Sequence, residues 1–124
     1  MKIVAVVPHR SFRIAGDAIS LCDVFPRFRF RAGDNIAFSV AVVMFAEEGD
    51  RGAYWLTIEM TDPVGRVLYR SAIDVPTGDA GHYIMQIQNV AAEVVSPGLY
   101  HLDVSLEDET ISLPVIFFEM EEPQ

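Results

Sequence analysis

The stretch from Ser96 to Glu119 constrains the fold most, because it carries the clearest β-hairpin pattern in the sequence. It opens on Pro97–Gly98, where proline presets a negative φ and glycine accepts the positive φ that a type II turn needs next. Apolar and polar residues then alternate over 100–106 and again over 111–117, a period of two that places one face of each strand on a core. The acidic run 107–109 separates the two alternating segments and marks the turn between them.

Most of the remaining chain also alternates with a period of two, and glycine and proline interrupt it at short intervals. This pattern predicts an all-β protein, because no segment with the helical period is long enough to form a layer. Besides the hairpin pair, strands are expected over 2–7, 18–25, 27–31, 36–45, 53–61, 66–75 and 82–89. Two antiparallel sheets packed face to face would bury their apolar faces, so we expect an immunoglobulin-like β-sandwich of about seven to nine strands. A small β-barrel is the alternative.

Single residues predict further details of this sandwich. Tyr100 follows the turn at the start of the penultimate strand, where such sandwiches place a tyrosine whose hydroxyl ties down the corner. The alternation over 82–89 predicts three inward side chains: Tyr83, Met85 and Ile87. The segment 90–95 connects that strand to the hairpin and is expected to hold a short helical turn.

The 124 residues are expected to form one domain, 1–118, followed by an acidic C-terminal tail, 119–124. Cys22 is the only cysteine, so no disulfide can form within the chain, which favours a reducing compartment. The apolar run 3–7 is shorter than a signal-peptide core of about seven residues or more. No run approaches the roughly twenty apolar residues of a membrane helix. We therefore expect a cytoplasmic protein with no membrane partner.

The net charge of −9 is unevenly distributed along the chain. Residues 1–31 hold six basic and two acidic residues, a net charge of +4, whereas the remaining 93 residues hold three basic and sixteen acidic ones, a net charge of −13. Binding to nucleic acid depends on neutralising phosphates with lysine and arginine. The acidic excess therefore argues against a nucleic-acid partner.

Short segments spread over most of the chain carry a family resemblance: the N-terminal strand, GDAISLCDVF at 16–25, DPVGRVL at 62–68, PGLY at 97–100 and ISLPV at 111–115. In these segments the chain resembles a family of short, uncharacterised bacterial domain-of-unknown-function proteins with an immunoglobulin-like β-sandwich. The resemblance implies the sandwich fold and a bacterial or phage origin. It transfers no catalytic residue, because that family has no established activity.

Residue types that carry chemistry are present but lack the spacing of a functional motif. The chain has three histidines, His9, His82 and His101. No two of them have the spacing of a zinc motif, and the last two are expected on the surface. Cys22 has no neighbouring histidine to activate its thiol and is expected to be buried and inert. The acidic groups 47–50 and 107–109 lack the alternation of a calcium loop. We expect no catalytic residue, no metal and no cofactor, and hence no enzyme.

The segment 27–31, RFRFR, is the sharpest polar feature. Its alternation places Phe28 and Phe30 on one side of a strand and a basic stripe on the other, formed by Arg27, Arg29 and Arg31. One interpretation is a binding stripe for an acidic partner. The favoured interpretation is a surface strand whose arginines pair with the acidic excess of this chain or of another copy.

An apolar surface is the more informative prediction. By the same alternation, Val43 and Phe45 on one strand and Trp55 on the next share the face that points away from the core. Such a patch usually marks an interface, and tryptophan is a common anchor there. The alternative is that a bulge shifts the register and turns Trp55 inward. At the other end of the chain, Ile116 and Phe118 also lie on the outer side of their strand. We expect another element of the chain or a second subunit to cover them.

Two functions remain open from the sequence. The first is a non-catalytic interaction or structural domain that self-associates as a homodimer, or binds another protein, through a sheet face or an edge strand. The second is a module for a small ligand such as a carbohydrate, with Trp55 and Tyr54 as a stacking platform next to carboxylates.

Overall fold

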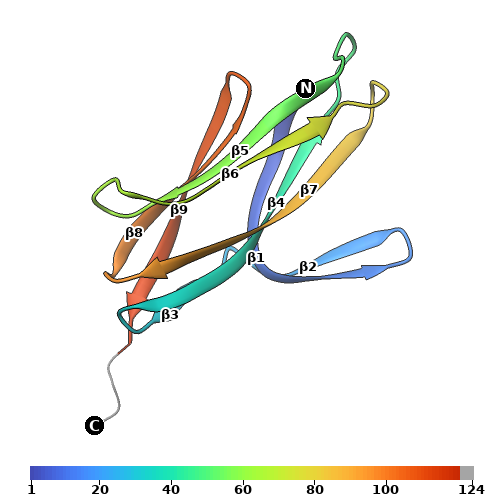
Figure 1. Cartoon of the computed structure of the whole chain (residues 1–124). Helices are drawn as coiled ribbons and strands as arrows, with labels where there is room; N and C mark the ends of the chain where they lie inside the picture. The colour runs from blue at the N-terminus through green and yellow to red at the C-terminus, as the bar shows by residue number, and fades with distance from the viewer. Residues whose placement is uncertain (121–124) are drawn as a thin grey trace.

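A computed structural model describes residues 1–120 and confirms the all-β sandwich. The described strands are β1 (Lys2–Ala15), β2 (Ala18–Val24), β3 (Phe28–Phe30), β4 (Asp34–Phe45), β5 (Ala53–Thr61), β6 (Val67–Pro76), β7 (Tyr83–Val94), β8 (Gly98–Leu106) and β9 (Glu109–Glu119). A four-stranded sheet in the order β2-β1-β4-β7 packs against a five-stranded sheet in the order β3-β9-β8-β5-β6 (Figure 1). All the pairings are antiparallel except that of β3 with β9, which is parallel.

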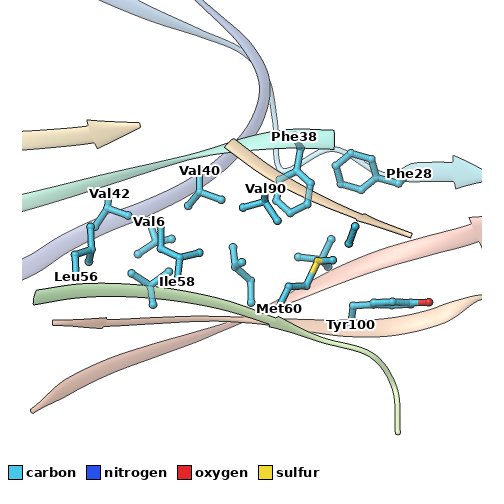
Figure 2. Close-up of a cluster of buried hydrophobic side chains, with 14 of the residues drawn as sticks. Val6, Phe28, Phe38, Val40, Val42, Leu56, Ile58, Met60, Val90 and Tyr100 are labelled. Atoms are coloured by element: carbon cyan, nitrogen blue, oxygen red, sulfur yellow. The ribbon is translucent and has the colours of Figure 1, made fainter. Parts of the chain in front are cut away.

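The core lies between the sheets and is built from alternate residues of the central strands. Figure 2 shows these rows facing one another, with Val6, Val40 and Val42 on one side and Leu56, Ile58 and Met60 on the other. At the end of the sandwich near β3, the core becomes aromatic. The ring of Phe117 stacks on Phe28 with 5.1 Å between centroids and lies 4.5 Å from the ring of Tyr100.

The predicted hairpin is confirmed as β8 and β9. Tyr100, Leu102, Val104 and Leu106 are buried, as the alternation predicts. The Tyr100 hydroxyl donates a hydrogen bond of 2.6 Å to the carbonyl oxygen of Ser96, which is the corner contact expected for an immunoglobulin-like sandwich.

The predicted orientation of β7 is wrong. Tyr83 is 67% exposed and Met85 40% exposed, whereas Ile84 and Val90 face the core. The segment 90–94 is a continuation of the strand and holds no helical turn. Because this continuation places Val90, Ala92 and Val94 in the core, the residues of opposite parity, Ile87 included, point outward.

β1 is more than twice as long as the strand predicted over 2–7, because it continues through Pro8 to Ala15. Pro8 pairs with Val40, and its carbonyl accepts a hydrogen bond from the amide of Phe25 at 2.8 Å. Beyond His9, β1 leaves β4 and pairs only with β2. Residues 10–23 of this hairpin, here called the arm, project from the sandwich (Figure 1).

At its C-terminal end, β9 includes Glu119, and the amide of Met120 donates to the carbonyl of Phe30 at 2.8 Å. The sheet therefore extends past the predicted domain end at residue 118. Residues 121–124 of the predicted acidic tail lie outside the described residues. In the part of the chain that is described, no helix has the length and hydropathy needed to cross a membrane.

Candidate interaction surfaces

The five predicted interface residues do not form one patch. Val43 and Phe45 point outward from the four-stranded sheet, while Trp55, Ile116 and Phe118 lie on the outer side of the five-stranded sheet. The predicted shared face of β4 and β5 is wrong because these consecutive strands belong to different sheets. Of the two orientations that the sequence leaves open for Trp55, the structure has the outward one, with an exposure of 59%.

The outer side of the four-stranded sheet carries an apolar patch instead. The pairing register aligns Val7, Ala41 and Ile87 in one row, Ala5, Val43 and Met85 in the next, and Phe45 with Tyr83 at the end. We call this patch the open face: Ala5, Val7, Ala41, Val43, Phe45, Tyr83, Met85 and Ile87. The rings of Phe45 and Tyr83 lie 5.0 Å apart. Every side chain in the open face is uncharged, and Lys2 borders it beside Phe45.

Polar residues limit the open face toward the arm. The Ser39 hydroxyl donates to the side-chain oxygen of Asn89 at 2.8 Å, which joins β4 to β7. His9 pairs with Ser39 and is fully buried, with Nδ1 3.0 Å from the carbonyl oxygen of Val7. Its ring meets that of Phe12 edge-on at 6.2 Å, so the root of the arm is packed against the sheet.

The arm itself carries an apolar row on one side. Phe12 pairs with Leu21, and Ile14 pairs with Ile19, so the four side chains follow one another on one face of the hairpin. Ile14 is 67% exposed, Ile19 44% and Phe12 40%. The opposite face of the arm carries Arg13 paired with Ser20, and Ala15 paired with Ala18.

The predicted basic stripe is present at the end of the sandwich near β3. Phe28 and Phe30 are buried, and Arg27, Arg29 and Arg31 are exposed. Within residues 1–120 these three arginines form no ion pair, so pairing with this chain's own carboxylates is not observed there.

The opposite end of the sandwich is acidic, because the turns after β4 and β8 carry Glu47, Glu48, Glu107 and Asp108. Asp50 lies among them and forms an ion pair with the N-terminal amino group. Hydrogen bonds from that amino group, from the Tyr54 hydroxyl and from the Glu47 amide lower the pKa of Asp50 from 3.8 to about 2. The Asp50 carboxylate therefore stays ionised at neutral pH.

The outer side of the five-stranded sheet is polar around a shallow hollow of about 340 Å³. The hollow is lined by Thr57, Glu59, Arg70, Asp103, Ser105 and Thr110. Thr57 follows Trp55 on the same side of β5, so the exposed indole lies along the same strand as the hollow. Tyr54, the other predicted platform residue, points inward, and its hydroxyl donates to Asp50 at 2.8 Å. The predicted two-ring platform is thus reduced to Trp55.

The remaining candidates for chemistry are dispersed. Within residues 1–120, no three His, Cys, Asp or Glu side chains come together as a metal site. Cys22 is half-buried on β2, so the predicted full burial of its thiol is wrong. His101 is exposed and His82 is half-buried.

Ile116 lines an apolar hollow of about 240 Å³ together with Pro8 and Phe25, where the arm joins the sandwich.

No model of a known protein family matches the sequence, and a search of curated proteins finds no match. Among solved structures, the chain is similar to the C-terminal domain of wzt, with 15% identity and a TM-score of 0.49 over 98% of this chain and 74% of that chain. It is also similar to part of a beta-glucosidase from Listeria innocua, with 13% identity and a TM-score of 0.45 over 73% of this chain and 14% of the enzyme. At this level of similarity, neither likeness identifies a family or an activity for the chain.

Proposed function

We propose that the chain is a non-catalytic interaction domain that forms a homodimer by packing the open faces of two copies against each other. The observation that carries this proposal is the apolar, uncharged open face, in which Tyr83 is 67% exposed and Met85 40% exposed to water. Contiguous apolar patches on soluble proteins mark interaction sites. A flat sheet face also suits a second sheet, because two sheets pack about 10 Å apart with interdigitating side chains.

Two-fold symmetry allows a second copy of the chain to cover the open face. In a two-fold interface the same patch meets itself, so one apolar face supplies both halves. Phe45 and Tyr83 would act as the aromatic anchors, because aromatic side chains dominate the buried centre of interfaces.

The distribution of charge supports an antiparallel arrangement of the two copies. The arginines of the basic stripe and the acidic turns lie at opposite ends of the sandwich. A two-fold axis across the strands brings the acidic end of one copy beside the arginines of the other, whereas an axis along the strands joins the two acidic ends. The first arrangement is therefore favoured, and its stability should fall with rising salt concentration.

The Tyr83→Glu variant tests the proposed dimer. We expect the wild-type protein to have twice the 13.8 kDa mass of one chain by light scattering and sedimentation equilibrium. Tyr83→Glu should be monomeric, with dimerisation weakened at least about a hundredfold, because each copy would bury an unpaired carboxylate. Val64→Glu is the matched control, since Val64 is 89% exposed on the β5–β6 turn. A monomeric wild type at about 1 mM, or a Tyr83→Glu dimer as tight as the wild type, would contradict the proposal.

A second candidate function, carbohydrate binding, is favoured by one specific observation. The exposed indole of Trp55 lies beside a hollow lined by hydroxyl, carboxylate and guanidinium groups. Sugar rings present an apolar face for stacking and hydroxyls for hydrogen bonds, and ligand sites combine an apolar surface with a few placed polar groups. We offer this as an alternative use of the five-stranded sheet.

Trp55 is the only tryptophan, so its fluorescence reports this site directly. If the site binds sugar, titration with cellohexaose or chitohexaose should shift the emission to shorter wavelength with a saturating curve. Asp103→Ala should weaken the affinity about tenfold or more, because a hydrogen bond to a charged group contributes about 1.5–3 kcal/mol. Unchanged emission at about 10 mM of either sugar would count against this function and would leave the dimer proposal untouched.

A further inference from the structure

The apolar row of the arm lacks cover from its own chain. Residues 10–20 are all exposed, including Phe12, Ile14 and Ile19. A two-stranded hairpin is marginally stable in water unless a third strand or another element packs on its apolar face. The arm pairs with no third strand beyond His9, because β1 leaves β4 at that residue.

The arm rises from the same side of the four-stranded sheet as the open face. In Figures 1 and 2, the blue ribbon of β1 turns away from the five-stranded sheet where it leaves the sandwich. His9 lies on the outer side of β1, opposite Ser39, and contacts Phe12. The apolar row therefore begins beside the His9–Ser39 pair, which adjoins the open face at Val7 and Ala41.

The open face alone is small for a stable interface. Its apolar part spans about 17 Å along the strands, for five residues at about 3.4 Å, and about 14 Å across three strands. Its flat area is thus about 240 Å². The solvent-accessible area is larger because side chains project from the sheet, but even about twice the flat area is less than the ~800 Å² that each partner buries in a stable complex. The two-stranded arm, about 20 Å long and 10 Å wide, adds a flat area of about 200 Å².

The length of the arm also places it against a partner. From Arg10 to Ala15 the arm is about 20 Å long, whereas two packed sheets lie only about 10 Å apart. A second copy seated on the open face would therefore lie within reach of the arm, and the arm would extend past the nearer sheet of that copy.

We propose that the arm clasps the second copy in the dimer, so that Phe12, Ile14, Ile19 and Leu21 are buried against the flank of the partner. This inference rests on the proposed dimer and adds a second element to its interface. By two-fold symmetry, each copy gives one arm and receives one. The clasp brings the buried area toward that of a stable complex and gives the hairpin the packing that it lacks alone.

A double variant, Ile14→Asp with Ile19→Asp, tests the clasp. Both side chains are exposed in the single chain, so the sandwich should stay folded, with an unchanged far-UV circular dichroism spectrum. We expect the dissociation constant of the dimer to rise at least about tenfold, because two apolar contacts are replaced by carboxylates. The matched control is Ala18→Asp with Ser20→Asp, on the opposite face of the same strand pair, which should change the constant less than about twofold.

Hydrogen exchange of the wild-type protein provides a second test of the clasp, without any substitution. Amides of the arm should be protected more strongly at concentrations where the dimer forms than at concentrations where it dissociates. Equal exchange of the arm in dimer and monomer would overturn the clasp, as would an unchanged dissociation constant in the Ile14→Asp, Ile19→Asp variant. If Tyr83→Glu still abolishes the dimer in that case, the open-face dimer stands without the clasp. A wild-type protein that never dimerises would remove both.

Discussion

Replacing Val90 with aspartate is expected to unfold the domain, whereas the same replacement at Ala91 leaves it folded. Val90 is fully buried in β7 opposite Phe38, so a carboxylate there has no partner and loses its hydration. An uncompensated buried charge costs about 3–5 kcal/mol or more, a large part of the roughly 5–15 kcal/mol that holds a domain together. Ala91 points to the opposite side and is exposed, so Ala91→Asp should cost less than about 1 kcal/mol. Circular dichroism and urea denaturation measure both variants.

The reverse result would restore the orientation of β7 that the sequence predicts. If Ala91→Asp unfolds the domain and Val90→Asp does not, residues of odd number face the core. Tyr83, Met85 and Ile87 would then leave the open face, and the proposed dimer would lose its exposed anchor. The pair of variants thus tests the register on which the interface depends.

The error in β7 has a physical origin in how apolar residues alternate there. Over 83–88 the odd positions are all apolar, whereas two of the three even positions are the glutamines Gln86 and Gln88, so alternation over this short window favours the wrong side. The structure tolerates Gln86 and Gln88 on the inner side, and the amide of Gln88 donates to the Tyr69 hydroxyl at 3.3 Å. A longer window would have found the correct parity, because Val90, Ala92 and Val94 continue in phase with Ile84.

Local patterns were sufficient where both strands of a pair are adjacent in sequence. The β8–β9 hairpin, its acidic turn and the corner contact of Tyr100 were all predicted correctly. The separation of Phe28 and Phe30 from the exposed arginines of the basic stripe is also predicted correctly, whereas the sequence leaves both orientations of Trp55 open. In each case, burial on one side fixes the register of the strand.

Assignment of strands to sheets could not be predicted in the same way. β4 and β5 are consecutive, yet the loop between them crosses from one sheet to the other, so Val43 and Trp55 point to opposite sides of the molecule. Alternation describes the two faces of one strand and contains no information on which sheet receives it. The strand predicted over 18–25 corresponds to β2, but the half of the arm that belongs to β1 lies outside the strand predicted over 2–7. Pro8 follows that predicted strand, and proline is tolerated in a strand where no ladder hydrogen bond needs its missing N–H.

Replacing Phe117 with alanine should lower the free energy of unfolding by about 3–5 kcal/mol, the usual cost of removing a fully buried phenylalanine. Phe117 is 1% exposed, and its ring contacts the rings of Phe28, Phe30 and Tyr100. Urea denaturation should show a lower midpoint with an unchanged slope, because the same surface is exposed on unfolding.

The neighbouring Phe118 provides the matched control, since it points outward from the same strand and is 42% exposed. Phe118→Ala should cost less than about 1 kcal/mol in the monomer. Phe117→Ala should also destabilise β3, because that strand has only three residues and pairs with β9 at positions 117–119. Faster hydrogen exchange at Arg29 and Phe30 in Phe117→Ala would show that the aromatic cluster fixes the basic stripe in place. Equal costs at the two positions would mean that Phe117 is not the centre of this core, and the stripe would then depend on backbone pairing alone.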